Sequence, residues 1–151
     1  MTTQIQISSR DKVWVEISKD AVRHNVSLIR KMMGEDITLL AVVKANAYGL
    51  GLAPIARVLF KSGVNYFGVS HIAEGVLLRK ILPDASILIL GPSFRDHVED
   101  ILTHNLVPMV SSLELLGRIH DVAVMMGKRA KVHLMIDTGM GRIGLWHEKE
   151  D

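Results

Sequence analysis

Short apolar runs alternate with segments of helical periodicity along this chain, and the alternation restricts the possible folds more than any other feature. The first run is TLLAVV at 38–43, and further predicted strands, mostly apolar, follow at 66–70, 86–91, 106–110 and 131–137. A strand that is buried on both faces has such a continuous apolar sequence, as in a parallel sheet. Between the runs, apolar residues recur at helical spacing. The pattern predicts an α/β fold with a parallel sheet of about five strands.

Residues that typically begin and end helices separate the first predicted elements. WVEI at 14–17 predicts a short leading strand, after which Ser18 is placed to cap a helix that ends at Gly34. Pro54 lies in the first turn of the next predicted helix, and Gly63 ends that helix. These signals set the approximate limits of the first two helices.

Two later helix starts show the capping-box pattern, in which a serine is followed three positions later by an acidic residue. Ser93 with Asp96 predicts the start of one helix, and Ser111 with Glu114 predicts the start of another that runs to Gly127. A helix therefore separates the later apolar runs from one another, as parallel strands require.

Two architectures fit these β/α units: a doubly wound open sheet, or the N-terminal portion of a (β/α)8 barrel. A complete barrel takes about 250 residues, whereas this chain has 151. The last apolar run is followed by a glycine-rich segment and the charged end HEKED at 147–151, without a closing helix. The hydrophobic fraction of 48% and the mean hydropathy of +0.25 are high for a small independent domain. We therefore expect an incomplete domain whose missing neighbours would cover its apolar surface, and both architectures stay open at this point.

Composition and charge exclude several classes of protein. The chain has no cysteine, which excludes disulfides and thiolate metal sites, and its seven histidines show no metal-ligand spacing. The net charge of +2 is not gathered into a basic stripe, so we expect no nucleic-acid partner. The sequence has neither a secretory signal nor an apolar stretch of about 20 residues. We therefore expect a cytoplasmic protein that does not enter a membrane.

GMGRIG at 139–144 has the G-x-G-x-x-G spacing of dinucleotide-binding loops. A dinucleotide site also requires a following helix and an acidic residue about 20 positions later, and the sequence provides neither. The long cation Arg142 would crowd the close backbone approach to pyrophosphate that such glycines permit. A plain glycine turn and a loop for a different cofactor are the alternatives.

Lys44 follows the apolar run within AVVKANAYGLG at 41–51 and is the first candidate for chemistry. In barrels, the carboxyl ends of the strands carry the active site. A lysine at such a place is partly withdrawn from water, which favours the neutral amine that attacks carbonyl groups. The alternative is a lysine whose ammonium group reaches water from the end of a strand.

Four segments together resemble the alanine racemase family. They are VWVEISKDAVRHNVSLIRK at 13–31, FGVSHIAEGVLLRK at 67–80, LAVVKANAYGLG at 40–51 and IDTGMGRIG at 136–144. The pairing of K-A-N-A-Y-G with D-T-G-M-G-R is characteristic of that family, and the resemblance extends over 13–146.

The resemblance implies the N-terminal portion of a pyridoxal-phosphate-binding (β/α)8 barrel, with the family's second, β domain absent from this chain. On this division residues 1–12 are a tail, and residues 13–34 form a leading strand and helix. Residues 38–137 then hold five β/α strands, and 138–151 form the cofactor loop and the truncated end. Members of the family work as homodimers, so the resemblance also implies a homodimeric full-length protein.

The resemblance further implies an isomerase that uses pyridoxal 5′-phosphate to interconvert L-alanine and D-alanine for peptidoglycan precursor synthesis. It implies that Lys44 forms the Schiff base with the cofactor aldehyde and that Tyr48 lies near the cofactor phosphate. Arg142 would reach the cofactor's phenolic oxygen and the substrate carboxylate, and Met140 would lie beside the substrate. These residue types suit the roles, because a permanently charged guanidinium binds anionic oxygens and a phenol donates to phosphate.

Racemisation removes a proton from one face of Cα and returns one to the other, so it needs two acid–base groups. Lys44 is one of them, and the resemblance assigns the other to a tyrosine from the second domain of a partner subunit. Tyr48 and Tyr66 are the two tyrosines of this chain, and neither lies in a matching motif. We therefore expect the 151 residues alone to be inactive.

Two positions depart from the family pattern. Met135 stands where many members have a lysine that orients the loop arginine, and methionine cannot supply that charge. Leu50 replaces a histidine that is common after A-Y-G in the family.

Two other functions stay open on the sequence. One is a racemase of a different amino acid on the same scaffold, such as a serine racemase or an enzyme of broad specificity. The other is not an enzyme but a truncated fragment that binds the cofactor or a protein partner.

Overall fold

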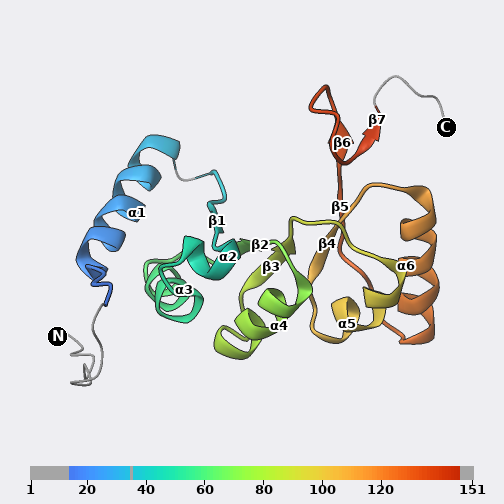
Figure 1. Cartoon of the computed structure of the whole chain (residues 1–151), viewed down its shortest axis with the longest axis horizontal. Coiled ribbons are helices and arrows are strands. Elements are labelled where there is room, and N and C mark those ends of the chain that lie inside the picture. Colours follow the sequence, from blue (N-terminus) through green and yellow to red (C-terminus); the bar gives the residue numbers. More distant parts are fainter. Residues whose placement is uncertain (1–13, 35, 147–151) are drawn as a thin grey trace.

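Five parallel strands form one sheet in which neighbours in sequence are neighbours in space (Figure 1). The structure is a computed structural model, and it describes residues 14–34 and 36–146. The strands follow the order β1 (Leu40–Val42), β2 (Tyr66–Val69), β3 (Ser86–Ile89), β4 (Val107–Val110) and β5 (His133–Leu134). This arrangement confirms the predicted α/β fold with a parallel sheet.

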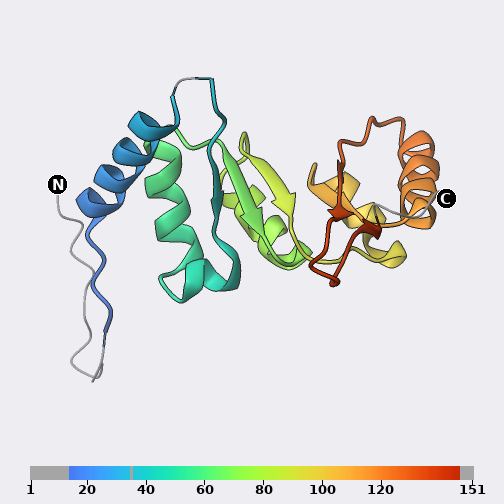
Figure 2. The ribbon, with the colours of Figure 1, turned by 90° about the horizontal axis from the view of Figure 1, so that it is seen from above.

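Helices connect the successive strands and begin before the first one. They are α1 (Lys19–Met33), α2 (Lys44–Tyr48), α3 (Leu52–Lys61), α4 (Ile72–Ile81), α5 (Val98–Thr103) and α6 (Leu113–Met125), with a 3-10 turn η1 (Arg95–His97) ahead of α5. Figures 1 and 2 show α1 and α6 at opposite ends of the long axis, with the other helices between them in chain order. No helix of the described ranges is long and apolar enough to cross a membrane.

The core lies between the sheet and the helices that follow each strand. Alternate residues of β2 and β3 are fully buried there, as in Phe67, Val69, Ile87 and Ile89. They pack in one cluster with residues of α3 and α4 that recur at helical spacing. A second cluster joins α5, α6 and the end of β4. Burial of such side chains stabilises each by about 1.5–3 kcal/mol, which explains why the apolar runs identified the strands.

The sheet is strongly curved, as a contact across its other face demonstrates. The Tyr66 hydroxyl of β2 lies 2.8 Å from Nε2 of His133 in β5, and their rings meet edge to face. Two strands lie between β2 and β5, and neighbouring strands are spaced by about 4.8 Å. Side chains that stand perpendicular to a flat sheet would not meet over that span. The curvature is that of a partly closed barrel.

Two predicted strands differ in the structure. Residues 14–17 have no strand partner among the described residues, and Trp14 and Val15 are more than half exposed. A strand needs a neighbour to hold its backbone hydrogen bonds, so this prediction is wrong. The predicted strand at 38–43 is shortened to β1, and Val42 is 39% exposed rather than buried. β1 is a margin of the sheet, so less of the protein covers it.

The predicted ends of the first two helices are confirmed. The Ser18 side chain accepts a hydrogen bond from the backbone N–H of Ala21, and Gly34 follows the last residue of α1. Gly34 has a φ of 86°, which favours glycine. Pro54 lies in the first turn of α3, and Gly63 follows that helix with a φ of 85°.

The predicted capping box at Ser93 and Asp96 is wrong. The chain forms the 3-10 turn η1 at this point, preceded by Phe94, instead of starting a regular helix. Ser93 Oγ is buried and has no hydrogen-bond partner in the described part of the chain. The serine therefore lies too far from the first turn of α5 to cap it.

The second predicted capping box is displaced by one residue. Ser112, not Ser111, caps α6, and its hydroxyl accepts from the backbone N–H of Leu115 at 3.2 Å. Glu114 points away and forms an ion pair with Arg95 at 2.7 Å. The sequence offers two adjacent serines, and only the folded chain distinguishes between them.

The last predicted strand, at 131–137, is divided in the structure. Met135 separates β5 from β6 (Ile136–Asp137), and β6 pairs with β7 (Leu145–Trp146) in a second, two-stranded sheet. The backbone of Met135 joins the two parts, because its N–H donates to Val110 and its carbonyl accepts from Leu145. Residues 1–13 and 147–151, which include the predicted tail and the charged end, lie outside the described residues.

Candidate functional site at the carboxyl edge of the sheet

Lys44 and the 138–144 loop follow strands that end at the same edge of the sheet. Lys44 comes directly after β1 and Val43, and the loop comes after β5 and β6. Because the strands are parallel, both lie at the carboxyl edge, where α/β proteins place ligands. β1 and β5 are the first and last strands of the sheet, so three strands separate the Lys44 segment from the loop (Figures 1 and 2). No hydrogen bond, ion pair or ring contact joins Lys44 or Tyr48 to Arg142 within 14–34 and 36–146.

The turn that carries Lys44 has a left-handed backbone. Ala45, Asn46, Ala47 and Tyr48 have φ values from 52° to 55°. The left-handed conformation costs L-residues roughly 1–2 kcal/mol each, so four in succession persist only where the surroundings hold them. Such strained backbone is common at functional sites.

Two polar side chains hold this left-handed turn. Asn46 Oδ1 accepts the backbone N–H of Leu52 at 2.8 Å, at the start of α3. The backbone N–H of Asn46 donates to Glu74 Oε1 at 3.4 Å. Glu74 Oε2 accepts from the N–H groups of Ser70 and His71 at 3.0 and 3.3 Å. Glu74 therefore links the Lys44 turn to the loop after β2.

Sequence reasoning missed Asn46 and Glu74 as parts of the site. A partial signal was present, because asparagine tolerates the left-handed conformation better than most residues. Glu74 stands in the first turn of α4, where an acidic residue is ordinarily read as a helix cap alone. Nothing local indicates that the same carboxylate reaches Asn46, which lies 28 residues earlier.

Lys44 is half-buried at this turn, and in the chain it follows the buried Val43 and precedes the buried Ala47 by three residues. Its side chain has no hydrogen-bond or ion-pair partner among the residues that the structure describes. Tyr48, four residues on, is 64% exposed at the end of the same turn. An amine and a phenol are thus both available to a ligand at this edge.

Asp137 organises the loop that carries Arg142. Its Oδ1 accepts the backbone N–H groups of Gly139 and Gly141 at 2.9 and 3.0 Å. Its Oδ2 accepts the backbone N–H of Arg142 at 3.0 Å. These backbone donors, led by Gly139 and Gly141, hold the pKa of the Asp137 carboxyl below its ordinary value, although burial opposes them. The carboxylate is therefore ionised at neutral pH.

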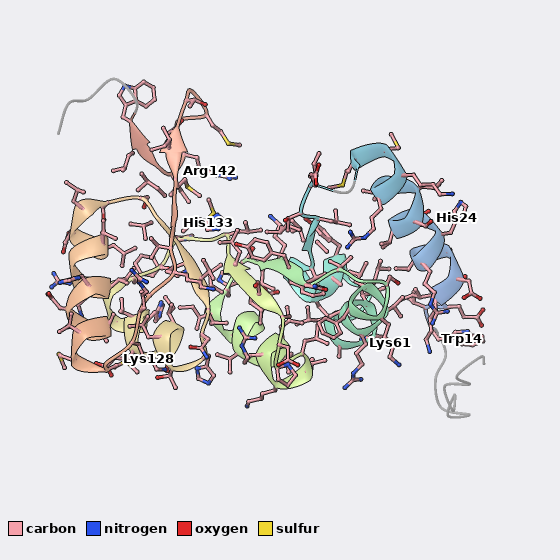
Figure 3. The ribbon with its side chains drawn as sticks, turned by 180° about the vertical axis from the view of Figure 1, so that it is seen from behind. Trp14, His24, Lys61, Lys128, His133 and Arg142 are labelled. Carbon is pink, nitrogen blue, oxygen red and sulfur yellow. The ribbon has the colours of Figure 1, made fainter. Side chains whose placement is uncertain are left out.

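The side chains of this loop point away from the core. Met140 is 76% exposed, and Arg142 is also exposed. The guanidinium of Arg142 has no polar partner within the described ranges. Figure 3 shows Lys128, His133 and Arg142 succeeding one another from the amino edge of the sheet to the carboxyl edge. Arg142 can therefore meet an anionic ligand at the edge where Lys44 also lies.

Leu50 has a structural role in this chain. It lines a small, mostly apolar cavity of about 180 Å³ together with Val15, Ile17 and Pro54. Leu50 thus borders the same cavity as the segment that leads into α1.

Another cavity, of about 350 Å³, lies at the opposite, amino edge of the sheet. Several lysine and arginine side chains line it, and two of them donate hydrogen bonds to backbone carbonyl groups. Arg79 donates to four carbonyl groups, and Lys128 Nζ donates to the carbonyl of Leu102 at 2.7 Å. This cavity is part of the scaffold and is separate from Lys44 and Arg142.

Comparison with known proteins identifies a family for nearly the whole chain. The family model "Alanine racemase, N-terminal domain" matches residues 17–151. An alanine racemase from Desulforamulus reducens is 40% identical over 141 residues, which make up 93% of this chain and 38% of that protein. The chain therefore spans little more than a third of the length of this relative.

Solved structures agree in fold with this chain. An alanine racemase from Clostridium difficile has a TM-score of 0.83 at 37% identity, over 87% of this chain and 34% of that one. An alanine racemase from Bartonella henselae with covalently bound pyridoxal phosphate has a TM-score of 0.78 at 28% identity, over 87% of this chain and 38% of that one. A histidine racemase from Leuconostoc mesenteroides has a TM-score of 0.77 at 28% identity, over 85% of this chain and 34% of that one.

Proposed function

This chain belongs to the alanine racemase family through that family's N-terminal domain, and we propose that it forms part of an enzyme that interconverts L-alanine and D-alanine. The observation that supports this most directly is the position of Lys44. It stands at the carboxyl end of β1, on a strained turn, with an amine that no described residue engages. We assign residues 38–137 to the β/α units of the barrel and 138–151 to the cofactor loop and the segment after it.

We propose pyridoxal 5′-phosphate as the cofactor, and the donor set at the carboxyl edge fits it. The cofactor has an aldehyde, a phosphate and a phenolic oxygen, which require an amine and hydrogen-bond donors. Lys44 offers the amine, Tyr48 a phenol and Arg142 a guanidinium, and all three side chains are at least partly accessible. When bound, the cofactor supplies an electron sink for the negative charge that develops on the substrate Cα.

The residues of this chain would then have distinct tasks. Lys44 would hold the cofactor through its amine and exchange a proton with one face of the substrate Cα. Arg142 would bind the phenolic oxygen and the substrate carboxylate, because a guanidinium stays charged and suits anionic oxygens. Tyr48 would donate to the phosphate. Met140, exposed beside Arg142 in sequence, would contact the substrate.

The second acid–base group is proposed to come from outside this chain, in a homodimer of the full-length protein. Tyr66 lies at the start of β2, at the amino edge, and its hydroxyl is engaged by His133. It therefore lies at the edge of the sheet opposite the edge that carries Lys44 and Arg142. We also propose a cytoplasmic role in the supply of D-alanine for peptidoglycan.

Covalent trapping of the cofactor tests the proposal on the chain itself. The chain is incubated with pyridoxal 5′-phosphate, reduced with borohydride and digested, and the modified lysine is identified by mass spectrometry. We expect the modification at Lys44 and its loss in Lys44→Ala. Lys61→Ala is the matched control, because Lys61 is exposed at the end of α3 and distant from Arg142 (Figure 3). Equal labelling of several exposed lysines, with none preferred at Lys44, would refute the cofactor assignment.

A racemase of another amino acid is the second candidate, and the similarity to a histidine racemase favours testing it. The higher identity to alanine racemases supports alanine as the substrate. Turnover of a panel of amino acids, by a protein that carries these residues at the full length of its relatives, separates the two. Faster racemisation of histidine or serine than of alanine would reverse the assignment.

A further inference from the structure

We propose that Asp137 is the positioning residue for Arg142, acting through the backbone of the 138–142 loop. The inference deepens the proposed function, on which the role of Arg142 rests. Asp137 itself touches neither substrate nor cofactor in this scheme. It sets the place from which the guanidinium of Arg142 reaches an anionic ligand.

The geometry closes the loop around a single carboxylate. Both oxygens of Asp137 are used, one by Gly139 and Gly141 and the other by the backbone N–H of Arg142. Charge-assisted hydrogen bonds of this kind are about twice as strong as those between neutral groups. The chain from 137 to 142 is thereby tied into a ring that includes the amide of Arg142.

The far end of the loop also packs on Asp137. A Cβ atom added to Gly144 would lie 2.7 Å from the backbone nitrogen of Asp137 and 3.1 Å from its Cβ. Gly144 also has a φ of 139°, which side-chain-bearing residues rarely adopt. The loop is therefore held against Asp137 both near its start and at its end.

Asp137 is the one charged residue that is buried among those the structure describes, at 7% exposure. A buried carboxylate is costly unless hydrogen bonds satisfy it, and the three backbone donors do so. Without the Asp137 carboxylate, these N–H groups would have to donate to water, and the loop would lose the hydrogen bonds that hold it in place.

The side chain of Arg142 has no anchor of its own among the residues that the structure describes. No hydrogen bond or ion pair holds its guanidinium within 14–34 and 36–146. The position of Arg142 therefore depends on the loop backbone, which its own amide and the packing of Gly144 join to Asp137. For this reason we infer that a change at Asp137 acts on ligand binding through Arg142.

Amide exchange gives a readout that needs no cofactor. In Asp137→Asn, one side-chain oxygen still accepts from Gly139 and Gly141, but an NH₂ group replaces the oxygen that faces Arg142. We expect the Arg142 amide proton to exchange about tenfold faster, which is the effect of losing one such bond. Asp121→Asn, on the exposed side of α6, is the control. An unchanged exchange rate at Arg142 overturns the proposal.

A titration of the unsubstituted chain provides the same test if Asp137→Asn folds poorly. The amide proton shifts of Gly139, Gly141 and Arg142 should move with one shared midpoint as Asp137 is protonated. An Arg142 amide that does not follow the other two overturns the proposal.

A double-mutant cycle tests the link to the ligand. Pyridoxal 5′-phosphate is titrated into the unsubstituted chain, Asp137→Asn, Arg142→Ala and the double variant. We expect Asp137→Asn to weaken binding about tenfold alone and to add little when Arg142 is already alanine. An equal loss in both backgrounds would mean that Asp137 does not act through Arg142. If the unsubstituted chain binds no cofactor, the proposed function fails, and the amide measurements then decide the role of Asp137 by themselves.

Discussion

The hydroxyl of Tyr66 lies 2.8 Å from Nε2 of His133, although 67 residues and two strands separate them. The contact joins the amino ends of β2 and β5 across the inner face of the curved sheet. We expect Tyr66→Phe to lower the free energy of unfolding by about 1 kcal/mol, which is typical for one hydrogen bond. Urea unfolding followed by circular dichroism measures it. A variant as stable as the unsubstituted chain would contradict a stabilising contact.

The same pair predicts a change of stability at high pH. Burial raises the pKa of Tyr66 above its ordinary value of 10.0. The folded state therefore favours the protonated phenol, and this part of the stability is present below pH 10 and is lost as the pH rises through the raised pKa. The stability of the unsubstituted chain should fall more steeply above pH 10 than that of Tyr66→Phe. Parallel curves for the two proteins would argue against the predicted effect.

Arg79 is predicted to be important for stability rather than for ligand binding. Its guanidinium donates to the carbonyls of His104, Pro83, Ala85 and Asn105 at 2.6–2.9 Å. It thus joins the segments that enter β3 and β4. We expect Arg79→Met to cost about 3 kcal/mol, because these partly buried carbonyls lose their donors.

Thermal unfolding measures the loss at Arg79, and Arg57→Met is its control. Arg57 is exposed on α3 and makes no resolved polar contact in the described part of the chain. Its replacement should change the free energy of unfolding by less than about 0.5 kcal/mol. Similar losses in both variants would show that the four carbonyl contacts carry no special stability.

Asn46 is predicted to affect both stability and the reactivity of Lys44. Asn46→Ala removes the acceptor for Leu52 and puts a residue that disfavours positive φ into the left-handed turn. The two effects together should cost about 2 kcal/mol. Asn46→Asp keeps an acceptor oxygen and should cost little. Urea unfolding measures the first effect, and borohydride trapping at Lys44 measures the second. If borohydride trapping at Lys44 is unchanged in Asn46→Ala, then the conformation of the turn does not affect the reactivity of Lys44.

Asp137 should contribute stability that disappears in acid. Its pKa is held below the ordinary value of 3.8. The contribution is therefore complete above pH 3.8 and is lost as the pH falls through the lowered pKa of the folded state. The difference in stability between the unsubstituted chain and Asp137→Asn should be constant near neutrality and should shrink in acid. A difference that is independent of pH would assign the effect to packing instead of charge.

The sequence predicted the β/α alternation and the carboxyl-edge position of Lys44 because both depend on local pattern. Burial decides which segments are strands, and burial is visible as continuous apolar runs such as 86–91. The strand at 14–17 was wrong because pairing depends on a neighbour that no local pattern supplies. The break at Met135 was missed for the same reason, since its backbone partners Val110 and Leu145 are distant in sequence or lie beyond a loop.

The chemical residues were predicted by resemblance, whereas their supports were not. Glu74 and Asp137 look in the sequence like an ordinary helix cap and an ordinary turn residue. Their importance comes from the backbone N–H groups that converge on them, including that of Asn46 from another β/α unit. Such convergence is a property of the folded chain.

The position of β1 and β5 at the two margins of the sheet has a mechanical consequence. The distance between the amine of Lys44 and the guanidinium of Arg142 depends on the spacing and rotation of every pair of neighbouring strands between them. Neighbouring strands are rotated by about 20–25° on average, and small changes of one sign in these rotations would add together. A substitution in the middle of the sheet, such as one at Ile87, can therefore widen or narrow the gap that a ligand must bridge without contacting either residue.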